Sequence, residues 1–469
     1  MKASPPPTMP EPPTAGAAAG SLPDSAPIDV ARLIEQRPLG AFTVRLVLVC
    51  WLVTFFDGYD MNVVGFANPY LAPEFHLDKL MLTNVALAGN SGALIGGFLF
   101  GFLGDRLGRR TAIILATVLF GALTLALSLV NGYHPFLLLR LLNGIALGGA
   151  IPLTWALGTE YVPARYRATA VTLIMVGYGL GFATAGPLSA WLVPHSGWRA
   201  LFGLGGGASL LAAAVLFWAL PESLRFLVTR RPGSEQLQRA VRRTLCGQRL
   251  APNARFVLPD EVGAGASGTA LARLFRGPLA RITPCIWLGY LASSMTIFFL
   301  TFWGPLVYGE LGFSHRAAAL LASGMSIAGM SGGLAIMRFT DRIGVKSLAL
   351  FPAAAVPLLL LTGLLHVSHP QFAALILSLS VFLNGSHYGI TSITGLFYPT
   401  ACRAFGTGWA STFGKVGSLV GPGIGGVVLA SGLPTQHVFA LMAVCPATLC
   451  LCLLGIGQVQ ARVSPAGQR

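Results

Sequence analysis

Twelve long apolar runs constrain the fold of this chain more than any other feature of its sequence. Each run approaches the roughly 20 residues that an α-helix needs to cross the hydrocarbon core of a bilayer. A closed β-barrel would instead show shorter segments of alternating polarity. We therefore expect an all-α membrane protein with 12 transmembrane helices. The runs are centred near Val53, Ala93, Leu119, Ala146, Gly177, Ala212, Ser294, Ala328, Pro357, Leu379, Lys415 and Val444.

Composition and charge agree with a membrane protein. Hydrophobic residues make up 54% of the 469 residues and charged residues only 10%, too little polar surface to coat a soluble globule. The net charge of +15 could indicate a nucleic-acid partner. However, most Lys and Arg residues fall in alternate loops, as the positive-inside rule requires if both termini are cytoplasmic. We expect a multi-pass protein of a bacterial inner membrane, with lipid and no nucleic acid as partner.

The polar segments suggest the domain organisation. Residues 1–40 comprise a Pro- and Ala-rich tail, expected to be disordered, and a possible interfacial helix from Ile28 to Arg37. We expect a six-helix bundle at 41–220, an arginine-rich cytoplasmic linker at 221–281, a second bundle at 282–458 and a cytoplasmic tail at 459–469. The 7 cysteines show no metal-binding or disulfide spacing.

An internal repeat supports the division into two halves. A shift of 236 residues superposes five identical residues at predicted cytoplasmic loops. The pairs are Asp105 and Asp341, Gly108 and Gly344, Pro163 and Pro399, Arg167 and Arg403, and Ala168 and Ala404. Parallel halves of this kind place a substrate site between them, near the middle of the membrane.

Two acids, Asp57 and Asp60, lie inside the first apolar run. A carboxylate at this depth costs about 2.5 to 3.5 kcal/mol, so the pair needs a compensating role. Their spacing of three puts them on one helix face, where one carboxylate favours protonation of the other. They could load and unload a proton. Alternatively, they form a structural pair that Arg140 or Lys415 neutralises.

The repeat assigns these charges to different halves. The positions equivalent to the two acids are the neutral Ser293 and Thr296, and the position equivalent to Lys415 is Gly179. Proton chemistry is therefore expected in the N-terminal half and an intramembrane cation in the C-terminal half.

The first predicted cytoplasmic hairpin reads Gly101-Phe-Leu-Gly-Asp105-Arg106-Leu-Gly108-Arg109-Arg110. Its glycines let two helices approach and turn sharply, and its arginines suit the headgroup region. This run resembles the signature loop of the major facilitator superfamily, which implies a cytoplasmic gate. Topogenic charge alone would explain the arginines but not the glycines. The second copy keeps Asp341 and Arg342 but begins with Met337, so we expect a looser gate there.

The fourth apolar run contains Arg140-x3-Gly144-x3-Gly148-x3-Pro152, similar to the fourth helix of the same superfamily. Steps of four place these residues on nearly one helix face, so the glycines predict close packing and Arg140 is expected to point inward. The alternative is that Arg140 snorkels to the outer interface.

Further motifs resemble the aromatic acid:proton symporters within that superfamily. They are Asp57-Gly-Tyr-Asp60, Glu160-Tyr-Val-Pro-Ala-Arg165-Tyr-Arg167, Pro221-Glu-Ser-Leu-Arg225 and Phe397-Tyr-Pro-Thr-Ala-Cys-Arg403. The resemblance implies that Glu160, Arg165, Arg167 and Arg403 belong to the cytoplasmic gate. Two positions depart from the family, since Lys415 stands where an arginine is usual and His387 where we expect glutamine.

The resemblance implies a small aromatic carboxylate as substrate and a proton as coupling ion, without another cofactor. We expect Lys415 and His387 to bind the carboxylate, together with Arg140, Tyr59 and Tyr388, although His387 could be only a packed histidine. Flat walls for a ring could come from several aromatic residues. The candidates are Tyr59, Trp155, Tyr178, Phe298, Tyr388 and Trp409.

The expected function is uptake by proton symport, through rocking of the two halves in a monomer. A proton-driven exporter and a symporter of non-aromatic organic acids remain open. A membrane sensor that binds ligand without transporting it is an alternative of another class. An enzyme is not expected, because no nucleophile–base or metal spacing occurs.

Overall fold

The computed structural model describes residues 28–35, 40–244, 256–257, 272–343, 348–365, 367–398 and 402–463. All twelve predicted apolar runs lie in helices. Within the described residues, eleven helical segments are long and apolar enough to cross a membrane. The ninth run forms a shorter apolar helix of 15 residues, α14 (Leu350–Leu364), so the predicted count of twelve differs from the observed count there. The predicted Pro-rich tail before Ile28 lies outside the described residues.

The N-terminal half pairs helices that are distant in sequence. Helix α2 packs on α7, α3 on α5, and α4 on α8. The fourth apolar run is divided into α5 and α6 at Gly149. The bounds are α2 Ala41–Glu74, α3 Lys79–Leu107, α4 Arg109–Leu127, α5 Tyr133–Gly148, α6 Ala150–Glu160, α7 Ala164–Ser196 and α8 Arg199–Ala219.

The C-terminal half repeats this pairing. Helix α12 packs on α16, α13 on α15, and α14 on α18, in the same order as the three pairs of the first half. Equivalent packing agrees with the internal repeat in the sequence. The bounds are α12 Leu279–Glu310, α13 His315–Ile343, α15 His369–Phe397, α16 Arg403–Ala430, α17 His437–Met442 and α18 Val444–Val463.

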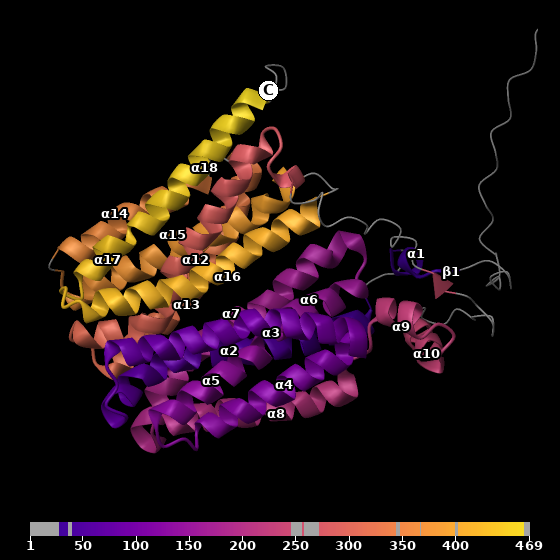
Figure 1. Cartoon of the computed structure of the whole chain (residues 1–469), viewed down its shortest axis with the longest axis horizontal. Helices are drawn as coiled ribbons and strands as arrows, with labels where there is room; N and C mark the ends of the chain where they lie inside the picture. Colours follow the sequence, from indigo (N-terminus) through magenta and orange to yellow (C-terminus); the bar gives the residue numbers. More distant parts are fainter. Residues whose placement is uncertain are drawn as a thin grey trace, which may run out of the picture.

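The two halves lie side by side (Figure 1). Helix α7 packs on α13, α3 on α16, and α2 on α12. Three helices and one strand outside the bundles gather at one end of the N-terminal half, which we call the linker end (Figure 1). They are α1 (Val30–Glu35), β1 (Ile28–Asp29), α9 (Leu224–Arg230) and α10 (Glu235–Thr244). The helices of the two halves diverge toward the linker end (Figure 1).

Glycines bring α3 and α5 into backbone contact, as the spacing of the fourth run predicts. A Cβ atom at Gly96 would lie 1.9 Å from the Ile145 carbonyl oxygen, and one at Gly148 would lie 2.0 Å from that of Ala93. Any larger side chain would force these helices apart, because neither backbone can yield. The prediction of close packing is confirmed.

The linker end contains a small substructure. Strand β1 (Ile28–Asp29) pairs in parallel with β2 (Phe256–Val257), and α1 (Val30–Glu35) follows β1. Val30 and Ile34 are buried in one apolar cluster with residues of α9 (Leu224–Arg230) and α10 (Glu235–Thr244). Of the segment Ile28–Arg37 predicted as an interfacial helix, Val30–Glu35 is helical, and its apolar side packs against protein.

Candidate functional site

A cavity of about 220 Å³ lies between the two halves. Its walls come from α2 and α7 on one side and from α12, α13 and α15 on the other. Aromatic, methionine and leucine side chains dominate, with a few polar groups among them, as is usual for sites that bind small molecules. The main lining residues are Asn62, Met175, Tyr178, Phe182, Phe298, Thr301, Ser326, Met330, Ser380, Asn384, His387 and Tyr388.

The cavity includes some of the site residues that the sequence predicts. His387 and Tyr388 line it, as do the predicted ring contacts Tyr178 and Phe298. Other candidates lie elsewhere among the described residues. Tyr59 is buried within the N-terminal half, where its hydroxyl donates a hydrogen bond to the Leu201 carbonyl oxygen at 3.0 Å. The side chains of Trp155 and Trp409 are partly exposed and do not line the cavity.

Asp60 belongs to a buried polar network inside the N-terminal half. Its Oδ1 atom accepts a hydrogen bond from the Thr124 hydroxyl at 2.6 Å, and its Oδ2 atom lies 3.3 Å from Arg140 Nη1. Asn143 connects the two partners, accepting from Arg140 at 3.0 Å and donating to Thr124 at 2.8 Å. The structure therefore pairs Arg140 with Asp60, and Arg140 is not among the residues that line the cavity.

Asp57 has a different environment from Asp60, although only three residues separate them. Its side chain is buried, and its Oδ2 atom has no hydrogen-bond partner among the described residues. Its charge interacts with those of Asp60 and Lys415. A buried carboxylate without a partner is costly to keep ionised, so Asp57 is suited to hold a proton.

Lys415 brings a cation from the C-terminal half to the acids of the N-terminal half. It lies on α16, and its Nζ atom would be 2.7 Å from a Cβ atom at Gly97 on α3. Its side chain is exposed, and its charge interacts with Asp57. Since Gly97 and Lys415 belong to different halves, movement of the halves changes the surroundings of this cation.

His387 is oriented by a hydrogen bond within the C-terminal half. Its Nδ1 atom lies 2.9 Å from the Ser293 hydroxyl oxygen. Ser293 is the repeat equivalent of Asp57, so a neutral hydroxyl takes the place of the acid in this half. The bond leaves the other ring nitrogen, Nε2, for the cavity that His387 lines.

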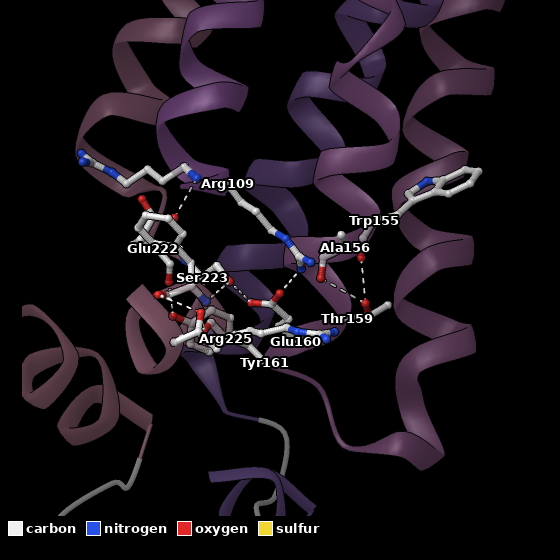
Figure 2. A network of polar contacts seen from close by, with 12 residues as sticks. Arg109, Trp155, Ala156, Thr159, Glu160, Tyr161, Glu222, Ser223 and Arg225 are labelled. Carbon is white, nitrogen blue, oxygen red and sulfur yellow. Dashed lines mark hydrogen bonds and ion pairs between the residues drawn. The ribbon is translucent and has the colours of Figure 1, made fainter. Parts of the chain in front are cut away.

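At the linker end, the predicted gate residues of the first hairpin contact the segment that follows α8 (Figure 2). Arg109 forms an ion pair with Glu160, which also accepts a hydrogen bond from the Ser223 hydroxyl at 2.6 Å. Glu222 Oε1 accepts from the backbone N–H groups of Arg110 at 3.0 Å and Ser223 at 2.9 Å. These contacts join the N-terminal bundle to the first residues of the linker.

Two glycines of the hairpin have distinct surroundings. Gly108 has a φ of 99°, and a Cβ atom there would lie 2.5 Å from the Glu222 carboxylate. At Gly101, no described atom lies within 4 Å of the Cβ position. The predicted turn at Gly108 is therefore confirmed, whereas Gly101 makes no close helix contact in this conformation. Asp105 interacts with the charge of Arg109.

The remaining gate candidates are spread over the linker end. Arg106 lies over the Phe102 ring, and Arg165 over the Tyr166 ring. Arg167 pairs with Glu35 of α1 at 3.3 Å. The side chains of the candidates in the second half lie outside the described residues; these are Asp341, Arg342 and Arg403.

Sequence reasoning missed two amides of the cavity wall, Asn62 and Asn384. Each is a polar residue in an apolar helix, and each lies within five residues of a predicted site residue, Asp57 or His387. A polar side chain at this depth is costly unless it has a partner or a role, so both could have been candidates.

The sequence matches the Major Facilitator Superfamily over residues 50–394 and 286–468. It is 32% identical to the 4-hydroxybenzoate transporter of Acinetobacter baylyi over 420 residues, 89% of this chain and 92% of that protein. It is 31% identical to the gallate transporter of Pseudomonas putida over 446 residues, 95% and 98% of the two chains. Among solved structures, the partially occluded inward-open xylose transporter of E. coli aligns with a TM-score of 0.64 and 19% identity, covering 92% of this chain and all of that one.

Proposed function

This chain belongs to the major facilitator superfamily, and we propose that it takes up a small aromatic carboxylate together with a proton. It is a transporter and not an enzyme. The relatives are named for 4-hydroxybenzoate, gallate and benzoate, all of which join an aromatic ring to a carboxylate. We also propose that it acts as a monomer in a bacterial inner membrane with both termini in the cytoplasm.

The observation that carries the proposal is the relationship between Asp57 and Lys415. The Asp57 carboxylate, whose buried Oδ2 atom has no hydrogen-bond partner among the described residues, lies within electrostatic reach of a cation from the other half. A substrate carboxylate that pairs with Lys415 would compete with Asp57 for this cation. Asp57 is then more favourably protonated, so binding of the anion and of the proton support each other.

The cavity provides the rest of the site. Tyr178 and Tyr388 offer hydrogen-bond donors to an anion, and Phe298 and Phe182 offer flat apolar surface to a ring. Asp60 and Arg140 would act as fixed structural charges, because they form a buried ion pair within the network of Thr124 and Asn143. In this proposal only Asp57 exchanges a proton during transport.

The contacts between the halves favour an inward-facing state, with the linker end in the cytoplasm. Asn68 of α2 donates to the Phe302 carbonyl oxygen at 3.2 Å, and the Gly186 N–H donates to the Ser323 hydroxyl oxygen at 3.1 Å. Both contacts lie near the end opposite the linker end. Closing the linker end would bring the two halves together at that end. The open space next to Gly101 would then allow a helix to pack against it.

Uptake measurements test the proposal. Purified full-length protein in proteoliposomes should accumulate labelled 4-hydroxybenzoate when the pH is lower outside, and it should only equilibrate the label without a pH gradient. Accumulation of an aliphatic acid in its place would favour the non-aromatic alternative. Binding without any flux would favour a sensor.

A further inference from the structure

A polar cavity of about 450 Å³ lies at the linker end, apart from the cavity between the halves. The start of α4, the end of α8 and the helices α9 and α10 contribute most of its walls. A smaller hollow of about 290 Å³ lies between the start of α2 and the end of α8. Both are lined by Phe42, Trp218, Leu220 and Pro221, so they adjoin around the end of α8, and we call them together the linker groove.

Four arginines line the linker groove, against one carboxylate. Arg110, Arg231 and Arg239 belong to the larger cavity and Arg45 to the smaller one. The carboxylate is Glu222, whose Oε1 atom accepts hydrogen bonds from two backbone N–H groups. The groove therefore has an excess of positive charge, and such a concave surface attracts anions.

Arg110 fixes the shape of the groove. Its Nε atom donates to the Leu220 carbonyl oxygen at 2.8 Å, and its Nη2 atom donates to that of Phe217 at 2.6 Å. These bonds hold the start of α4 against the end of α8. Arg110 is thus part of the wall, and the other three arginines are the groups that a ligand can engage.

The other three arginines retain N–H groups for a ligand. Arg45 is exposed and has no hydrogen bond or ion pair among the described residues. Arg231 donates from Nη1 to Gln236 Oε1 at 3.1 Å, and Arg239 pairs through Nη2 with the exposed Glu235. A guanidinium has five N–H groups in a planar fork, so both keep several donors, and this fork matches the oxygens of a phosphate.

The groove opens beside a surface that faces lipid. Helix α8 is long and apolar enough to cross a membrane, and it lies on the side of the N-terminal half away from the C-terminal half (Figure 1). Near its end Trp218 is 83% exposed and Phe217 is 57% exposed. Tryptophan at the end of a transmembrane helix is typical of the level of the lipid headgroups. Because Trp218 also lines the groove, the arginines lie at this level.

We propose that the linker groove binds the phosphate of an anionic phospholipid from the leaflet at the linker end. The arginines donate to the phosphate oxygens, and the acyl chains lie along the exposed apolar side of α8. An anionic lipid is favoured over a zwitterionic one, because the groove already carries excess positive charge and has no place for a choline cation. The inference goes beyond the proposed function, since this lipid lies outside the cavity between the halves.

A lipid in this groove connects the N-terminal bundle to the linker. Arg45 lies on α2, whereas Arg231 directly follows α9 and Arg239 lies on α10. A phosphate among these arginines neutralises like charges that otherwise repel one another. Binding therefore stabilises the packing of the linker helices on the bundle.

Lipid binding to the wild-type protein is the first test. Native mass spectrometry of purified, delipidated full-length protein measures the Kd of the first bound lipid. Phosphatidylglycerol should bind at least about tenfold more tightly than phosphatidylcholine. Equal affinity for the two lipids overturns the inference. Inorganic phosphate at the same concentration should not displace phosphatidylglycerol, and displacement would show that the groove takes free phosphate instead. No substrate is present, so either failure leaves the proposed transport function intact.

A pair of double variants assigns the lipid to the groove. Arg45→Gln with Arg231→Gln should weaken phosphatidylglycerol binding about tenfold and leave phosphatidylcholine binding unchanged. The matched control is Arg273→Gln with Arg276→Gln, which removes the same charge from exposed arginines that precede α12 and do not line the groove. An equal loss in both double variants, or no loss in the groove variant, would overturn the assignment.

Discussion

Lys79 on α3 and Glu310 on α12 form an ion pair across the two halves, with Nζ and Oε1 3.0 Å apart. Both lie at the end opposite the linker end, where Glu310 also accepts a hydrogen bond from Thr435 at 2.7 Å. A transporter that opens this end must break the pair. The ion pair therefore stabilises the conformation seen here relative to one that opens on the other side.

Lys79→Gln should shift the conformational equilibrium toward opening at this end. The pair is about one-third exposed, so its contribution is at most about 1 kcal/mol, roughly a fivefold change in population. Labelling of Thr301→Cys by an impermeant thiol reagent added outside, in a protein without native cysteines, measures this opening. Arg199→Gln is the control, because it breaks an ion pair with Glu74 at the same end but within one half. Equal labelling of Thr301→Cys with and without Lys79→Gln would contradict a role for this ion pair in holding the two halves together at this end.

Arg140→Leu should destabilise the fold. Removing one partner of a buried ion pair leaves Asp60 uncompensated, which costs about 3 to 5 kcal/mol. Thermal unfolding in detergent measures the loss, and addition of Asp60→Asn to the variant should restore part of it. An unchanged melting temperature for Arg140→Leu would contradict the structural role that we assign to this network.

Lys415→Ala should lower the affinity for aromatic carboxylates. A charge-assisted hydrogen bond contributes about 1.5 to 3 kcal/mol, so the loss should be about 10- to 100-fold. Lys415→Arg should keep most of the affinity, because it preserves the cation. Ligand-dependent thermal stabilisation of the purified variants measures binding without transport. Identical stabilisation of the alanine variant and the wild type would remove Lys415 from the site.

Gly108→Ala should destabilise the turn at the linker end of the N-terminal half and lower the melting temperature. An alanine would meet the Glu222 carboxylate and would have to adopt a φ of 99° with a ψ of 149°, at a cost of about 1 to 3 kcal/mol. Gly101→Ala has room for its methyl group in this conformation and serves as the comparison. Similar melting temperatures for the two variants would contradict this account of the turn.

Hydropathy and spacing predicted the helices and the glycine contacts, because these features depend on residues close in sequence. The different surroundings of Asp57 and Asp60 could not be predicted in this way. It depends on Thr124, Arg140 and Asn143, which α4 and α5 bring to Asp60 alone.

The cavity was predicted in part. His387 and Tyr388 lie in a motif that the family resemblance pointed to, and both line the wall. Tyr59 and Arg140 were expected there too, but helix periodicity alone does not distinguish the side of α2 or α5 that faces the cavity from the side that faces the bundle.

The most direct test of proton coupling compares Asp57→Asn with the wild type in proteoliposomes that contain labelled 4-hydroxybenzoate on one side. The asparagine variant should still exchange labelled for unlabelled substrate, because exchange requires no net proton movement, but it should not accumulate substrate in response to an imposed pH gradient. Asp57→Asn protein that accumulates 4-hydroxybenzoate as well as the wild type does would contradict the central role of this carboxylate.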